Sequence, residues 1–128
     1  RTVSEMSKVP AHWDEIGKAV SLRNQSKSKT KTLIIGNGDV LNAQDAELKA
    51  QEFGVDGVMI GRGVFANIAC FDKMGRILTK EEKLELMHEH DKLEPDKNRF
   101  KKYIKIYING FEGAAVMREQ IFATIDKR

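Results

Sequence analysis

Two short apolar runs, each ending in a pair of glycines, constrain the fold of this chain more than any other feature. The first, LIIGNGDV, occupies residues 33–40, and the second, VMIGRGVF, occupies residues 58–65. Both runs are apolar throughout rather than alternating, which is typical of strands in a parallel sheet covered on both faces. We therefore expect buried strands at 32–35 and 58–60.

The helix between these strands has clear boundaries in the sequence. Asn42 is suited to cap its first turn, and Gly54 is suited to end it. Its apolar face carries Ala43, Ala46, Ala50 and Phe53. An earlier helix is expected at 10–23, with Pro10 as its first residue, followed by an exposed polar loop at 23–32. The order helix, strand, helix, strand indicates an α/β fold.

The character of the chain changes after residue 78. Thr79 and Glu82 have the spacing of a capping box, which starts a helix running to about Leu93, and Pro95 breaks that helix. Because the segment that follows is also helical in pattern, we expect a small helical bundle here.

Two more helices complete the predicted bundle. The first ends at Gly110, and its apolar stripe comprises Phe100, Tyr103, Ile104, Tyr107 and Ile108. The second spans about 112–126, with Ala114, Met117, Ile121 and Ile125 on one face. We therefore expect two domains, an α/β domain at 1–78 and a helical domain at 79–128.

The glycines that follow both strands are candidates for binding an anion. Gly36 and Gly38 follow the first strand, and Gly61 and Gly63 follow the second, so both turns lie at the C-terminal ends of neighbouring parallel strands. Glycine lets backbone N–H groups approach a ligand closely, and a helix that starts after such a turn adds its positive dipole end. In α/β barrels the loops after the last two strands commonly form a phosphate site.

Charged residues in the two turns suit different roles. Arg62 offers a guanidinium fork to a phosphate. Asp39 would repel a phosphate, so we expect it to accept N–H bonds and hold the turn. Either turn alone is typical of an ordinary βα connection, but two in register with an arginine favour a phosphate site. A dinucleotide fingerprint is discounted, because GRGVFA at 61–66 is not followed by a second strand with a terminal acid at the required distance.

Five segments of the chain together resemble one enzyme family. They are SEMSKVPAHWDEI, LIIGNGDV, GVDGVMIGRGVF, NRFKKYIKIY and GAAVMREQI. In this order they resemble the C-terminal part of the tRNA-dihydrouridine synthases. The resemblance implies the last two βα units of a TIM (β/α)8 barrel, followed by a helical tRNA-binding domain. It also implies an FMN-dependent oxidoreductase that uses NADPH to reduce uridine in tRNA to 5,6-dihydrouridine.

The resemblance assigns roles to particular residues. It implies that the phosphate end of the flavin is held by Asn37, Gly38, Asp39, Gly61 and Arg62. It places Arg1 and Thr2 at the end of the family's H-G-R-T motif. The family's catalytic cysteine, and the histidine and lysine near the flavin, would all lie upstream of Arg1, so we expect no catalytic residue in this chain and no activity from it alone.

One departure from the family pattern lies after the second turn. The family usually reads G-N-P there, whereas this chain reads Ala66-Asn67-Ile68. We expect that turn to have a different shape.

Basic residues gather on the second predicted bundle helix. They are Lys97, Arg99, Lys101, Lys102 and Lys105, close to two tyrosines. Basic side chains near aromatic ones can bind phosphates and stack bases, although charge runs are usually solvated helix faces. With the resemblance added, tRNA binding is assigned to Arg99, Lys101, Lys102 and Arg118. Arg118 has the alternative of an internal ion pair.

Other candidate residues favour ordinary structural roles. Cys70 lies in the apolar segment IACF without a neighbouring base, so we expect a packed thiol. His88 and His90 point to different faces of a helix and read as solvated surface, so we expect no metal site. Trp13 is expected in the core and His12 at the surface.

The composition bounds location and partners. The net charge of +3 and the pI of about 9.0 favour an anionic partner only mildly. A single cysteine, the lack of a signal-peptide core and the lack of a membrane-length apolar run predict a cytoplasmic protein without a membrane partner. The chain begins with arginine, which indicates processing or excision from a longer protein. Exposed strand edges then predict self-association.

Two other hypotheses stay open at this point. One is a non-catalytic RNA-binding module in which the barrel segment is a remnant. The other is a different phosphate- or flavin-binding TIM barrel. Flavin absorbance and a salt-dependent shift with tRNA would separate the three.

Overall fold

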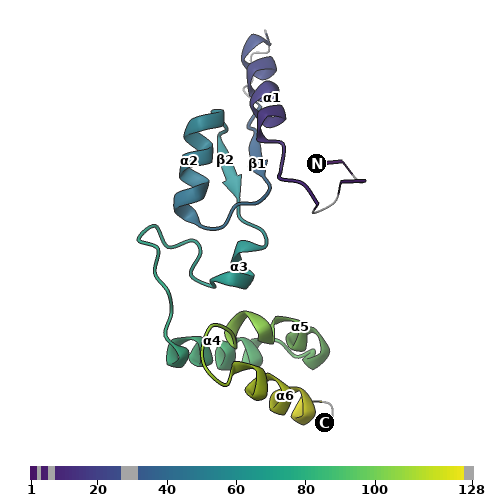
Figure 1. Cartoon of the computed structure of the whole chain (residues 1–128), viewed down its shortest axis with the longest axis vertical. Coiled ribbons are helices and arrows are strands. Elements are labelled where there is room, and N and C mark those ends of the chain that lie inside the picture. The colour runs from purple at the N-terminus through teal and green to yellow at the C-terminus, as the bar shows by residue number, and fades with distance from the viewer. Residues whose placement is uncertain (3, 6–7, 27–31, 126–128) are drawn as a thin grey trace. The chain divides into compact units, whose positions relative to one another are not determined.

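The computed structural model describes residues 1–2, 4–5, 8–26 and 32–125 and divides into two compact units (Figure 1). The first unit comprises Arg1–Val64 and Cys70–Gly75, and the second comprises Phe65–Ala69 and Arg76–Arg128. Each unit has its own cluster of buried apolar side chains.

The first unit is an α/β unit with a small parallel sheet. Its elements are α1 (Trp13–Gln25), β1 (Ile35–Asn37), α2 (Ala43–Phe53) and β2 (Gly57–Met59), and the short α3 (Gly63–Ala66) begins at its end. The two strands pair in parallel, with Gly36 opposite Val58. This confirms the predicted α/β class and the parallel direction of the strands.

The core of the first unit lies between the helices and the sheet. It is built on the buried side chains of Trp13, Val20, Val40 and Val55. Other apolar side chains of the strand segments remain exposed: Leu33 by 67%, Ile35 by 57% and Met59 by 51%. The expectation of a sheet covered on both faces is therefore wrong for the residues that the structure describes.

The first strand starts later than predicted because of one carboxylate. Asp56 accepts the backbone N–H of Ile34 at 3.0 Å and also pairs with Arg23. The N–H of Ile34 thus bonds to a side chain, while its carbonyl accepts the backbone N–H of Asp56 at 2.9 Å, and the paired strand begins only at Ile35. The same pair holds the end of α1, so Asn24 and Gln25 are helical although the sequence placed them in a loop. The rest of that predicted loop, residues 27–31, lies outside the described residues.

The ends of the other first-unit helices follow local chemistry. Asn42 caps α2 by accepting the N–H of Asp45 at 2.9 Å, and Gly54 ends it in a left-handed conformation with φ of 66°, as predicted. Pro10 is not the first residue of α1, because the helix begins at Trp13 after His12.

The second unit contains three longer helices: α4 (Lys80–Leu93), α5 (Lys97–Tyr107) and α6 (Ala114–Ile125). The predicted capping box is confirmed at the start of α4. α5 ends at Tyr107 rather than at Gly110, since Ile108 leaves the helical conformation with ψ of 74°. The side chain of Ile108 is fully buried in the same apolar cluster as that of Ile104.

A buried lysine joins two of these helices. Lys83 of α4 is only 7% exposed, and its ammonium donates to both the backbone carbonyl and the side-chain oxygen of Asn109 at 3.1 Å. The Asn109 amide in turn donates to the carbonyls of Lys105 and Ile106. Because these carbonyls lie at the C-terminal end of α5, a cation nearby is favourable there.

The capping box gives a first testable prediction. The Thr79 hydroxyl accepts the N–H of Glu82 at 3.2 Å, and the Glu82 carboxylate accepts the N–H of Thr79 at 2.8 Å. Thr79→Ala should lower the free energy of unfolding by about 1 kcal/mol, because it leaves a helix N–H without its acceptor. Urea unfolding followed by circular dichroism measures this loss. Thr79→Ser, which keeps the hydroxyl, is the control, and equal midpoints for all three proteins would contradict the prediction.

Candidate functional site

The two glycine turns begin at the same edge of the sheet. Asn37, the last residue of β1, lies opposite Met59, the last residue of β2. After Asn37 the backbone enters the left-handed half of conformational space, with φ of 133° at Gly38 and 53° at Asp39. Aspartate is one of the few side chains that tolerate such a φ.

The glycines of the first turn are required by packing. A Cβ on Gly36 would lie 2.5 Å from the ring of Trp13, and one on Gly38 would lie 2.5 Å from the Cβ of Ala11. The indole N–H of Trp13 also donates to the carbonyl of Gly38 at 2.8 Å. The start of α1 therefore presses directly on this turn and fixes its position.

The glycines of the second turn differ from one another. A Cβ on Gly63 would lie 2.4 Å from the carbonyl oxygen of Leu41, so packing explains this glycine as well. A Cβ on Gly61 would meet nothing within 4 Å among the described atoms. Gly61 is thus the position of the four where the backbone is open to an approaching group.

The carboxylate of Asp39 lies between two arginines. It accepts the backbone N–H of Ala11 at 2.9 Å and pairs with Arg62 at 3.1 Å and with Arg1. The predicted N–H bond of Asp39 is confirmed, although it comes from the segment before α1 rather than from the turn itself. Arg62 remains 68% exposed while it is paired, whereas Arg1 is 18% exposed.

Asn37 lines a cavity beside the start of α1. The cavity has a volume of about 570 Å³, and Arg1, Thr2 and His12 also line it. At this cavity the His12 ring lies 3.1 Å from the carboxylate of Glu5, whose pKa is lowered by the backbone N–H of Thr2 and by His12. This pair could not be predicted from the sequence, because nothing in the spacing of residues 5 and 12 indicates their contact.

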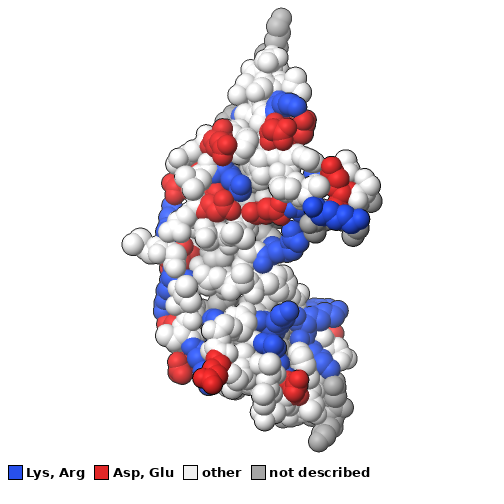
Figure 2. Space-filling model, viewed as in Figure 1, with Lys and Arg blue, Asp and Glu red and all other residues white. Residues whose placement is uncertain are grey.

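Basic side chains cluster on the second unit, as Figure 2 shows over α5. Lys102 and Lys105 are exposed, and Arg99 is 63% exposed with Glu94 at 3.7 Å. Lys101 lies over the ring of Phe122, with its nitrogen 5.2 Å from the ring centre. Three of the four residues assigned to tRNA thus share α5.

Arg118 differs from the other three. Its guanidinium donates to the carbonyl of Ile108 at 2.6 Å and is partly buried. The partner is a backbone carbonyl rather than the internal carboxylate considered from the sequence. This bond satisfies a carbonyl at the end of α5.

Comparison with known proteins now decides the family. A family model described as dihydrouridine synthase matches residues 1–128, the whole chain. The chain belongs to the dihydrouridine synthase family. This confirms the resemblance that the five segments predicted.

Individual members of the family align over nearly the whole chain. A probable tRNA-dihydrouridine synthase of Staphylococcus aureus (strain Mu50) is 39% identical over 97% of this chain. A probable tRNA-dihydrouridine synthase 2 of Bacillus subtilis (strain 168) is 36% identical over the same share. In both comparisons the chain spans 40% of the length of the relative.

The two histidines of α4 have different surroundings in this family member. His88 is exposed, as predicted, but the solvated position predicted for His90 is wrong. The Nδ1 of His90 lies 2.9 Å from the hydroxyl of Tyr107, and its ring packs edge-on against Phe100 with 5.2 Å between ring centres. Tyr103 is 37% exposed and leaves the core stripe in which the sequence placed it.

Two further expectations concern reactive groups. Cys70 is 1% exposed, and burial raises the pKa of its thiol, so the predicted packed thiol is confirmed. Among the described residues, no group of three or more His, Cys, Asp and Glu side chains is arranged to hold a metal ion.

In the same part of the chain, none of the helices has the length and apolar character needed to cross a membrane.

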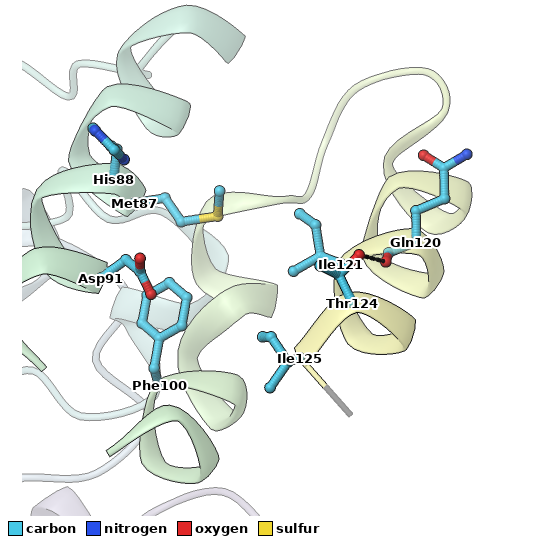
Figure 3. A pocket seen from close by; sticks show the side chains of 8 residues that line it. All are labelled: Met87, His88, Asp91, Phe100, Gln120, Ile121, Thr124 and Ile125. Carbon is cyan, nitrogen blue, oxygen red and sulfur yellow. Dashed lines mark hydrogen bonds between the residues drawn. The ribbon is translucent and has the colours of Figure 1, made fainter. Parts of the chain in front are cut away.

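A second cavity lies among α4, α5 and α6 (Figure 3). Its volume is about 290 Å³, and it is lined by Met87, His88, Asp91, Phe100, Gln120, Ile121, Thr124 and Ile125. Asp91 is engaged by Lys97 at 2.8 Å, and the Thr124 hydroxyl donates to the Gln120 carbonyl at 2.9 Å. Since the Gln120 amide points away in Figure 3, the cavity offers mainly apolar surface.

Proposed function

We propose that this chain is part of an FMN-dependent tRNA-dihydrouridine synthase, an oxidoreductase that uses NADPH to reduce a uridine of tRNA. Family membership and the names of the aligned relatives support the reaction. The observation that carries the flavin assignment is the open backbone at Gly61 beside the exposed guanidinium of Arg62. Backbone N–H groups and an arginine fork are the groups that bind phosphates in proteins.

The residues present fit the phosphate end of FMN. Both turns lie at the C-terminal edge of parallel strands, where ligands bind in α/β folds. We assign this end of the flavin to Asn37, Gly38, Asp39, Gly61 and Arg62. Bound FMN supplies the hydride-transfer chemistry, and these residues form the site that binds and orients it, either directly or, for Asp39, through the arginines that it pairs with. No residue of this chain is assigned a catalytic role.

The two compact units suggest that the two parts of the chain have different functions. We propose that residues 1–78 are the last two βα units of a TIM barrel and that residues 79–128 are a helical tRNA-binding domain. The parallel β1–α2–β2 unit and the separate core of the second unit support this division. The exposed side chains of Arg99 and Lys102 and the half-buried side chain of Lys101 support tRNA binding by α5. We add Arg118 to this surface, although its internal bond limits its reach.

Arg62→Ala tests the flavin assignment. In a full-length protein that carries this segment, the Kd for FMN should rise about ten- to a hundredfold, because a charge-assisted bond to phosphate contributes about 1.5–3 kcal/mol. Flavin fluorescence titration measures the change. Arg76→Ala is a matched control, since Arg76 is also exposed and paired with a carboxylate but lies outside the turns. Unchanged FMN affinity in Arg62→Ala would refute the assignment.

Flavin absorbance in the same full-length protein tests the function as a whole. A purified protein with a bound flavin supports the oxidoreductase. A flavin-free protein that still binds tRNA would instead favour the non-catalytic RNA-binding hypothesis.

A further inference from the structure

Three separate segments of the first unit meet at the carboxylate of Asp39. The N-terminal segment contributes Arg1, the segment before α1 contributes the N–H of Ala11 at 2.9 Å, and the second glycine turn contributes Arg62 at 3.1 Å. The two arginines contact different oxygens, Oδ2 for Arg1 and Oδ1 for Arg62. One carboxylate therefore ties both glycine turns to the start of α1.

The position of this carboxylate is fixed by the backbone that carries it. Asp39 has φ of 53°, and the preceding Gly38 is bonded through its carbonyl to the Trp13 indole at 2.8 Å. Trp13 itself is 6% exposed and anchored in the core. The packing of α1 thus fixes the position of the Asp39 carboxylate. This carboxylate contacts Arg62, which is exposed to solvent.

We propose that Asp39 is a positioning residue, which holds the guanidinium groups of Arg62 and Arg1 for a phosphate monoester and does not itself bind the phosphate. The inference rests on the proposed function, since the phosphate in question is that of FMN. Two guanidinium groups and one carboxylate leave a net positive charge, so the cluster still attracts an anion. An exposed arginine without a fixed partner would sample many rotamers, and binding would have to order it.

The positioning role and simple electrostatics predict opposite changes in FMN affinity when the charge of Asp39 is removed. Removing a negative charge close to a phosphate should strengthen binding by Coulomb's law. Removing the group that orders two arginines should weaken binding. The sign of the change in affinity therefore separates a positioning residue from a bystander.

Asp39→Asn is the decisive variant. Asparagine tolerates the left-handed backbone of this position, so the turn is retained while the charge is lost. In the full-length protein we expect the Kd for FMN to rise about tenfold, the size of one charge-assisted contact. The Kd for riboflavin, which lacks the phosphate, should not change. In an Arg62→Ala background, Asp39→Asn should have a much smaller effect, since its main target is gone.

Each other outcome has a definite meaning. If Arg62→Ala weakens FMN binding but Asp39→Asn leaves it unchanged or tightens it, the positioning role is wrong and the proposed function stands. If Arg62→Ala has no effect, both are wrong. An equal loss of FMN and riboflavin binding would show that Asp39 only supports the fold, and it would overturn the inference.

A second variant keeps the test valid if Asp39→Asn does not fold. Asp39→Glu retains the charge and moves the carboxylate by one methylene group. We expect it to weaken FMN binding and to spare riboflavin binding. Wild-type affinity for FMN in this variant would show that the charge alone is sufficient, and it would overturn the positioning role.

Discussion

Residues 1–128 alone should give no turnover with NADPH and unmodified tRNA. A closed (β/α)8 barrel requires eight strands and about 200 residues or more. The described residues contain two strands, and the chain spans 40% of the length of its relatives. The assay compares this chain with a full-length protein that carries it. Turnover by the chain alone would overturn the proposal that it is part of a larger enzyme.

The same chain should not behave as a simple monomer in solution. Leu33, Ile35 and Met59 are more than half exposed, and each strand of the described sheet pairs on one side only. Unpaired apolar strand edges bind other strands, so we expect self-association or exchange of elements between copies. Light scattering across a range of concentrations measures the mass. A constant monomeric mass would contradict this expectation.

Reversing the charge of Lys101 and Lys102 should strongly reduce tRNA affinity. Each phosphate contact releases counterions, so the loss of two should reduce the slope of log affinity against log salt by about two. Lys102 is exposed on α5, and Lys101 lies against Phe122 at the surface of the second unit. The double variant Lys101→Glu, Lys102→Glu is therefore titrated with tRNA at several salt concentrations.

The control for this experiment must change the net charge equally. Lys73→Glu, Lys92→Glu does so with two exposed lysines outside α5. The tRNA affinity of this control should fall less than that of the Lys101→Glu, Lys102→Glu variant. Its slope of log affinity against log salt should also change less. Equal effects in both double variants would mean that only the overall charge matters and that α5 is a solvated face.

Features determined by neighbouring residues could be predicted from the sequence. The Asn42 cap, the Gly54 end and the Thr79–Glu82 capping box each depend on contacts within a few residues, and all three are confirmed. The parallel strand pair followed from the apolar runs and the intervening helix. Here local chemistry and the fold agree.

Features that depend on distant contacts could not be predicted. Asp56 bonds to Ile34 and Arg23 and so shifts both a strand and a helix end, but no spacing in the sequence indicates these contacts. The contact between His90 and Tyr107 likewise depends on how α4 packs against α5.

The candidate site also combines features that the sequence predicts with features that only the fold shows. The sequence identified both glycine turns and Arg62, but it could not distinguish glycines needed for packing from one open to a ligand. Gly36 and Gly61 both lack a side chain, yet only the fold shows that the first is covered by Trp13 and the second by nothing among the described atoms. Glycine suits both a tightly packed position and a proposed ligand contact, so the residue type alone does not separate the two.

The indole that covers the first turn also gives the protein a built-in optical probe. The sequence contains one tryptophan, and its N–H bonds to the carbonyl of Gly38. Tryptophan emission therefore comes from a single place, at the first glycine turn. A shift in that emission during denaturation reports the melting of the first unit, while the ellipticity of the helices also follows the second. The two signals together show whether the units unfold in one step or in two.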